Sequence, residues 1–158
     1  SRVMNPTVTF FENKVKELTG AAEVIALNSG MAAISNTLFS IAAAGKNIVT
    51  SRHLFGNTYS FIAGTLSRFG VEPRLCDLTD IGAVEKVVDS NTCCIYVEII
   101  TNPQMEVADL QALSRIVHER GIPLIVDTTL IPFTEFDSHS LGVDIEVRGS
   151  HFHWWFSN

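Results

Sequence analysis

Short apolar runs that alternate with segments of helical periodicity constrain the fold of this chain more than any other feature. Residues 92–97, for example, are rich in β-branched and aromatic side chains and lack a regular polar face, which is typical of a strand buried on both sides. We expect strands at 24–27, 47–51, 72–77, 92–97, 124–126 and 143–147. Strands of this kind, separated by helices, predict an α/β domain in three layers, with a mainly parallel sheet and helices on both faces.

Helical periodicity fills most of the intervening sequence. Near the start of the chain, apolar residues fall three and four positions apart, at Val8, Phe11, Val15 and Leu18. This spacing indicates one face of an amphipathic helix. We expect that helix at 7–18 and others at 31–44, 58–69, 81–88 and 109–120. Asp80 and Asp109 precede two of them as candidate N-caps, and Tyr59 we assign to the core.

Charge and composition exclude several classes of partner. The net charge is −6 and no Lys/Arg cluster occurs, so we expect neither nucleic acid nor an anionic membrane, because both need a basic surface. Only 18% of the residues are charged and 46% are apolar, which favours self-association as a homo-oligomer. No apolar run is long enough to span a bilayer and no signal-peptide pattern opens the chain, so we expect a cytoplasmic protein. Cys76, Cys93 and Cys94 we expect to be buried, reduced thiols.

Several polar residues follow the expected strands, where parallel α/β sheets bind their ligands. Ser29 and Gly30 lie at a turn into a helix, where free N–H groups attract anions, although a plain tight turn would use the same residues. Asp127 ends an apolar run, so its buried carboxylate calls for a cationic partner; the alternative is a capping or turn aspartate. Asn102 precedes a proline, as in many turns, and Glu98 we read as structural.

Five short motifs occur in the order and spacing of one known family. They are Ser-Arg followed by Asn-Pro-Thr (1–7), Asn-Ser-Gly-Met-Ala-Ala (28–33), Leu-Phe-Gly-Asn-Thr-Tyr (54–59), Glu-Ile-Ile-Thr-Asn-Pro (98–103) and Pro-Leu-Ile-Val-Asp (123–127). Together they resemble the Cys/Met-metabolism family of enzymes that use pyridoxal 5′-phosphate (PLP). The resemblance covers nearly the whole chain and implies a PLP-dependent transferase-like fold, with an incomplete PLP-binding large domain at 1–147.

The resemblance also implies roles for individual residues. Gly30 and Met31 would supply backbone amides to the phosphate of PLP. Phe55 stands where the family usually has a tyrosine, so it would stack on the pyridine ring without offering a phenolic O–H. Asn102 would place its side chain against the ring hydroxyl, and Asp127 would hold the protonated ring nitrogen.

Two further implications concern the ends of the chain. Arg2 would reach the phosphate site of a neighbouring subunit, so a monomer could not complete its own site. The family's Ser-x-Thr-Lys, which carries the lysine that binds PLP covalently, falls on residues 149–152, where no lysine occurs. We therefore assign no catalytic residue.

Residues 148–158 have an unusual composition, because they contain both tryptophans together with His151 and His153. Our hypothesis is that this atypical tail is a translation of the wrong frame, a truncation scar or a cloning artefact. The two histidines lack further ligands nearby, so we expect no metal site.

The function implied by the resemblance is that of a fragment of a sulfur amino-acid enzyme. The parent enzyme would perform transsulfuration or sulfhydrylation of an O-acylhomoserine, and the Leu-Phe-Gly-Asn-Thr-Tyr variant most resembles O-acetylhomoserine sulfhydrylases. A sulfur amino acid or an O-acylhomoserine would be the parent's substrate, and PLP its cofactor. Without the lysine we expect this chain to be inactive. Two alternatives remain open, namely a catalytically dead interaction or dimerisation module and a noncovalent PLP binder.

Overall fold

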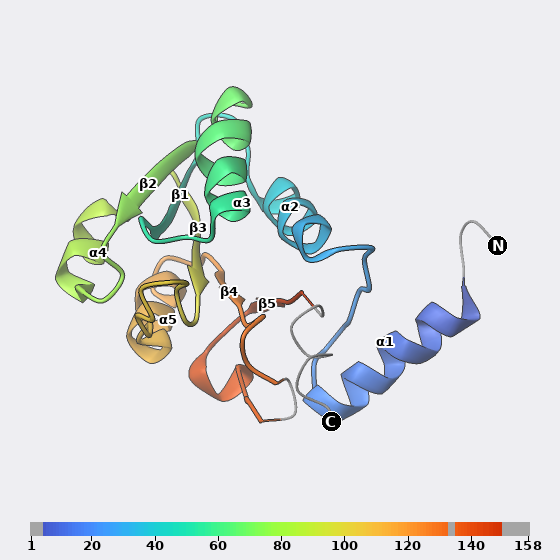
Figure 1. Ribbon diagram of the computed structural model, residues 1–158. Coiled ribbons are helices and arrows are strands. Elements are labelled where there is room, and N and C mark those ends of the chain that lie inside the picture. The colour runs from blue at the N-terminus through green and yellow to red at the C-terminus, as the bar shows by residue number, and fades with distance from the viewer. Residues whose placement is uncertain (1–4, 133–134, 150–158) are drawn as a thin grey trace.

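A five-stranded, wholly parallel sheet forms the centre of the protein (Figure 1). The computed structural model describes residues 5–132 and 135–149. Its strands are β1 (Asn47–Ser51), β2 (Glu72–Cys76), β3 (Thr92–Glu98), β4 (Leu124–Asp127) and β5 (Ile145–Val147). They lie in the order β2-β1-β3-β4-β5, and each pair of neighbours is parallel. The predicted parallel α/β sheet is therefore confirmed.

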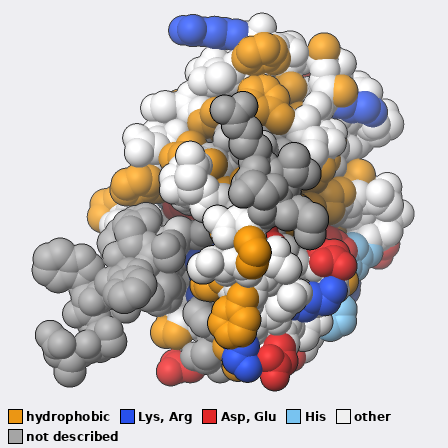
Figure 2. Space-filling view, turned by 90° about the vertical axis from the view of Figure 1, so that its right-hand side faces the viewer, with side chains coloured by type: hydrophobic (Ala, Val, Ile, Leu, Met, Phe, Trp, Pro, Cys, Tyr) orange, Lys and Arg blue, Asp and Glu red, His pale blue; other side chains and the backbone are white. Residues whose placement is uncertain are grey.

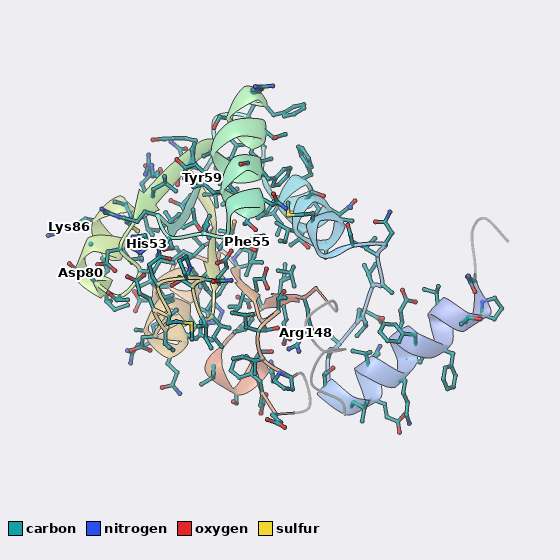
Figure 3. All side chains as sticks on the ribbon, in the orientation of Figure 1. His53, Phe55, Tyr59, Asp80, Lys86 and Arg148 are labelled. Carbon is teal, nitrogen blue, oxygen red and sulfur yellow. The ribbon has the colours of Figure 1, made fainter. Side chains whose placement is uncertain are left out.

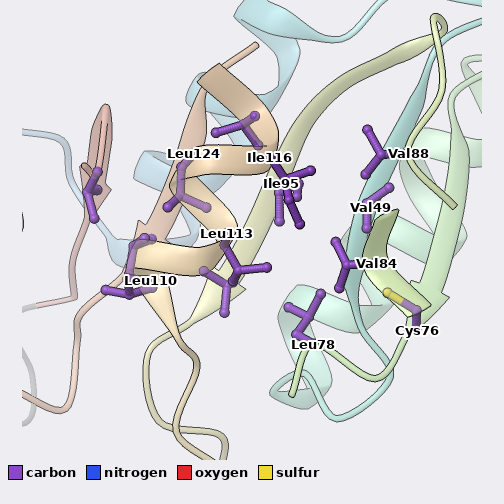
Figure 4. Packing of buried hydrophobic residues seen from close by; sticks show 14 of the residues in the cluster. Val49, Cys76, Leu78, Val84, Val88, Ile95, Leu110, Leu113, Ile116 and Leu124 are labelled. Atoms are coloured by element: carbon purple, nitrogen blue, oxygen red, sulfur yellow. The ribbon is translucent and has the colours of Figure 1, made fainter. Parts of the chain in front are cut away.

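Helices cover both faces of this sheet. One face packs against α2 (Gly30–Ile41) and against α3 (Gly56–Tyr59) with its π-helical continuation Ser60–Leu66. The other packs against α4 (Ile81–Val87) and α5 (Leu110–His118). Figure 4 shows this second core, where the side chains of α4 and α5 meet those of the sheet. The three predicted layers are thus confirmed.

Alternation of side chains along each strand separates the two cores. In β3, Tyr96 belongs to the α2/α3 core and Val97 to the α4/α5 core. In β1, Ile48 belongs to the α2/α3 core and Val49 to the α4/α5 core. Both sides of β3 and of β4 are buried, which explains why these two strands read as apolar runs in the sequence, whereas β2 at the sheet edge is only partly buried.

Polar side chains cap three of the helices where the sequence predicts a helix start. The Oγ atom of Ser29 accepts from the amide of Ala32 at the start of α2 (3.1 Å). Asp80 and Asp109 accept in the same way at the starts of α4 and α5 (3.1 and 3.0 Å). Each cap satisfies one amide that the helix itself leaves without a partner.

Some predicted elements are wrong. Residues 24–27 form no strand but a linker in which Ile25 is 78% exposed, because an apolar run becomes a strand only where a neighbouring strand can pair with it. The helix predicted at 31–44 ends at Ile41, because the backbone at Ala42 turns to an extended conformation. Tyr59, assigned to the core, is 42% exposed, because the buried positions of its helix are Thr58, Ile62 and Leu66.

Helix α1 (Pro6–Thr19) stands apart from the three layers (Figure 1). It contains no buried residue, and Phe10, Phe11 and Leu18 are each more than half exposed. Seen from the side of α1, the surface carries hydrophobic side chains scattered among polar ones (Figure 2). Within the described residues, no helix has the length and apolar character needed to cross a bilayer. Helix α1 is thus an amphipathic helix whose apolar side faces solvent.

Candidate functional site

A cavity of about 370 Å³ opens at the carboxyl ends of the strands. It is surrounded by the first turns of α2 and α3, the ends of β3 and β4, the loops after β1, β3 and β4, and one residue after β5. The lining residues are Ser29, Gly30, Met31, Ile34, Phe55, Asn57, Thr58, Glu98, Ile99, Ile100, Asn102, Asp127, Thr129, Leu130 and Gly149. The direction of strand order reverses between β1 and β3, and ligands bind beside such a reversal in open α/β sheets. We call this cavity the pocket.

The predicted cofactor-binding residues meet in the pocket from separate parts of the sequence. Gly30, Met31, Phe55, Asn102 and Asp127 all line it. Arg2 lies outside the described residues. Four loops or helix starts that are distant in sequence therefore contribute to one site.

The start of α2 presents two amides to the pocket. The first main-chain bond of the helix runs from the amide of Ala33 to the carbonyl of Ser29 (3.0 Å), and the Ser29 side chain takes the amide of Ala32. The amides of Gly30 and Met31 precede these bonds, so the helix provides no acceptor for them. Together with the positive end of the helix dipole, they form an arrangement suited to a phosphate.

Gly30 also permits a close approach of two chain segments. A Cβ atom at position 30 would lie 3.1 Å from the Cα atom of Gly149, at the exit of β5. Any side chain there would push the β5 exit away from α2. This packing requirement supplies a second physical reason for glycine, which the sequence alone does not reveal.

Asp127 is held at the end of β4 by donors from two directions. Its Oδ1 atom accepts from the amide and the hydroxyl of Thr129 (2.9 and 2.5 Å), and its Oδ2 atom accepts from the phenol of Tyr96 (3.2 Å). Burial, reinforced by the charge of Asp127, raises the pKa of Tyr96 far above its ordinary value, so the phenol keeps its proton and donates. Sequence reasoning missed Tyr96 and Thr129, although Tyr96 shares a strand face with Glu98.

Glu98, which the sequence reading treats as structural, is a second carboxyl group in the pocket. It ends β3 and pairs in register with Asp127 of β4. The amide of Phe55 donates to both of its oxygens (2.9 and 3.1 Å). Only 7% of Glu98 is exposed. Burial, with a smaller contribution from Asp127, raises the pKa of Glu98 to about 7, although the Phe55 amide opposes the shift.

The loop after β3 carries Asn102 to the pocket. An isolated antiparallel bridge joins Ile100 to Val107 at the base of this loop. Inside it, the amide of Thr101 donates to the carbonyl of Glu106, and the amide of Glu106 donates to the Thr101 hydroxyl (both 3.0 Å). These bonds close the loop on itself and place Asn102 at its pocket side.

None of the chain's lysines lines the pocket. Lys14 and Lys16 lie on α1, Lys46 precedes β1 and Lys86 lies on α4. Figure 3 shows Lys86 at the outer end of α4, well apart from Phe55. Within the part of the chain that the structure describes, no lysine amine is therefore placed to bond a ligand in the pocket.

The tail predicted at 148–158 falls mostly outside the described residues, and it stays a prediction. Arg148 and Gly149 are described. The guanidinium of Arg148 donates to the Thr128 hydroxyl (2.8 Å), to the Glu146 carboxylate (2.5 Å) and to the carbonyl of Ile131. These contacts tie Arg148 to the ends of β4 and β5.

Sequence and structure comparisons define the class of protein. Residues 1–151 match the sequence model of the Cys/Met metabolism PLP-dependent enzymes, and the chain belongs to this family, whose members depend on PLP. The resemblance found in the sequence is thereby confirmed.

Individual relatives are enzymes of sulfur metabolism. The chain is similar to the solved O-acetylhomoserine sulfhydrylase of Wolinella succinogenes, with 51% identity and a TM-score of 0.89 over 91% of this chain and 42% of that one. A putative O-acetylhomoserine (thiol)-lyase of Campylobacter jejuni, solved with N′-pyridoxyl-lysine-5′-monophosphate, is 34% identical with a TM-score of 0.89, over 94% and 37%. L-methionine gamma-lyase of Fusobacterium nucleatum is 37% identical over 95% of this chain and 38% of the relative. The chain spans about a third of the length of such curated relatives.

Proposed function

We propose that this chain supplies the PLP-binding wall of an enzyme that acts on an O-acylhomoserine, in the manner of O-acetylhomoserine sulfhydrylases. The observation that carries the proposal is the convergence of the Gly30 and Met31 amides, Phe55, Asn102 and Asp127 on one pocket. The cavity, about 370 Å³, falls within the roughly 300–1,000 Å³ typical of sites for small ligands and cofactors.

The pocket offers donors and acceptors that would suit each part of PLP. The Gly30 and Met31 amides would bind the phosphate, and Asp127, oriented by Thr129 and Tyr96, would accept the N–H of the pyridinium. Phe55 would stack on the ring, and Asn102 would hydrogen-bond the ring hydroxyl.

When bound, PLP supplies an electron sink for a carbanion at the α-carbon of an amino acid. The residues of this chain would hold and orient the ring, and Asp127 would keep a proton on its nitrogen. The phenyl group of Phe55 would exclude water from one face of the ring but cannot move a proton. Because no lysine lines the described pocket, we propose that this chain holds PLP noncovalently and is inactive by itself.

Borohydride reduction tests the noncovalent mode. We expect the chain to bind PLP in an absorbance titration, yet to gain no stoichiometric PLP adduct after reduction, as measured by intact mass. The same reduction on urea-unfolded chain gives the background labelling of exposed lysines. A single adduct that forms only in the folded chain would contradict the proposal.

We also propose that the chain forms a homo-oligomer, because the described residues of its own chain leave the apolar side of α1 unburied. The helix buries no residue, and it contacts residues 23–26 of its own chain through polar groups: the Glu12 carboxylate accepts from the amide of Ala26 (2.8 Å), and Lys16 pairs with Glu23 (3.0 Å). An isolated helix of this length is only marginally stable in water. A second copy that covers the apolar side would stabilise it.

Light scattering after size-exclusion chromatography measures this association. Replacing Phe10 and Phe11, which are 71% and 56% exposed, with serine should shift the mass towards the monomer, because apolar contact area is lost. Lys14→Ser on the same helix serves as the matched control and should leave the mass unchanged. Equal masses for the native chain and the double variant would argue against α1 as the contact.

A cytoplasmic location stays a prediction, which the three free, buried cysteines support.

A further inference from the structure

Segment 53–55 places an aromatic ring at the mouth of the pocket. Phe55 is 48% exposed and occupies the N-cap position of α3, where its side chain offers no capping acceptor. Leu54 belongs to the α2/α3 core, but Phe55 belongs to neither core. The packing of Leu54 fixes the path of segment 53–55, but it does not set the orientation of the peptide group that precedes Phe55.

The end of β3 supplies the missing constraint. Both carboxylate oxygens of Glu98 accept the amide hydrogen of Phe55 (2.9 and 3.1 Å). This bond sets the orientation of the peptide plane from which the Phe55 side chain departs. Because Glu98 is only 7% exposed, water competes little for the bond, and losing the acceptor would leave a poorly solvated amide.

A second tie joins the same segment to the Asn102 loop. The Nδ1 atom of His53 lies 2.9 Å from the Oε2 atom of Glu106, and each side chain is about one-third exposed (35%). The amide of His53 also donates to the Ser51 hydroxyl at the end of β1 (2.9 Å). Segment 53–55, which carries the Phe55 ring, is therefore linked directly to the loop that carries Asn102.

We propose that Glu98 and Glu106 are positioning residues, which hold segment 53–55 so that the Phe55 ring forms a fixed wall of the pocket. The proposal rests on the proposed function, since the ligand is taken to be PLP. Glu98 acts through a buried bond and carries the larger effect. Glu106 acts through a partly exposed pair, and such pairs contribute little.

Ligand titrations with two probes separate positioning from general damage. Pyridoxine 5′-phosphate carries the ring and phosphate but no aldehyde, and inorganic phosphate carries no ring. At pH 8, above the raised pKa of Glu98, Glu98→Ala should weaken binding of pyridoxine 5′-phosphate about tenfold, as loss of a hydrogen bond to a charged group predicts, and should leave phosphate binding unchanged. Glu98→Gln keeps an acceptor oxygen and should restore most of the affinity. Glu106→Gln should cost about twofold.

A double-mutant cycle tests whether Glu98 acts through the ring. In a Phe55→Leu background, where no aromatic ring remains to be positioned, Glu98→Ala should have little further effect on pyridoxine 5′-phosphate. An equal loss in both backgrounds, or an equal loss of phosphate binding, would overturn the proposal.

Hydrogen exchange of the Phe55 amide gives a readout without any ligand. The proposal requires faster exchange in Glu98→Ala than in the native chain, because the bond that protects the amide is gone. Unchanged exchange would overturn the positioning role. If the native chain binds no pyridoxine 5′-phosphate but the exchange difference is present, the proposed function fails while the positioning of segment 53–55 stands.

Discussion

Replacing Glu98 with glutamine should make the chain more stable at pH 8, by up to about 3 kcal/mol. Burial raises the pKa of this carboxyl from 4.5 to about 7, and each unit corresponds to about 1.4 kcal/mol. Below about pH 4.5 the group is protonated in both the folded and the unfolded chain. Between pH 4.5 and 7 the folded chain keeps a proton that the unfolded chain releases, so native stability falls as pH rises. Glutamine cannot ionise and removes this loss.

Urea denaturation at pH 5 and pH 8 measures the effect. From pH 5 to pH 8, the free energy of unfolding of the native chain should fall by more than that of Glu98→Gln. Glu106→Gln, at a carboxyl that is 35% exposed, provides the control and should follow the native chain. If the native and Glu98→Gln stabilities change in parallel with pH, then Glu98 does not titrate as a buried group.

The second large effect should follow from Asp127→Asn, which we expect to weaken PLP binding by about 30-fold or more. The single oxygen of asparagine can still accept from Thr129, and its NH2 group can donate to the Tyr96 hydroxyl, so both contacts can be kept with the second one reversed in direction. It lacks the negative charge that would pair with the pyridinium, and removing one member of a buried charge pair typically costs at least about 2 kcal/mol.

Absorbance titration with PLP provides the measurement. Asp137→Asn is the matched control, because it changes the net charge equally at an exposed residue that does not line the pocket. The control should bind PLP like the native chain. Similar affinity for Asp127→Asn and the native chain would show that the pyridine nitrogen does not meet this carboxylate.

Much of the fold could be predicted because strands that are buried on both faces appear in the sequence as short apolar runs. β1 and β3 are apolar on both sides, and the caps Asp80 and Asp109 mark helix starts by their own chemistry. Residues 24–27 show the limit of such reasoning. An apolar run says nothing about whether a neighbouring strand is present to accept its hydrogen bonds.

Residues of the candidate site could be predicted where they belong to a sequence motif. Contacts between residues of different strands could not be predicted. Gly30, Asn102 and Asp127 stand in recognisable motifs and line the pocket. The hydrogen bond from Tyr96 to Asp127 joins residues of two strands, 31 positions apart. Its existence depends on the register of β3 against β4, which no local pattern encodes. The hydrogen bond from the Phe55 amide to Glu98 is hidden in a similar way, because it depends on how β1 pairs with β3.

The strand order also bears on how the chain folds. β1 lies between β2 and β3, and β3 is synthesised only after β2 and α4. During synthesis, β1 and its first neighbour therefore expose an unpaired strand edge until β3 arrives. Sheets built from such distant pairings form slowly, and open edges invite aggregation in the interval. We therefore expect nascent chains that end before β3 to be clients of chaperones.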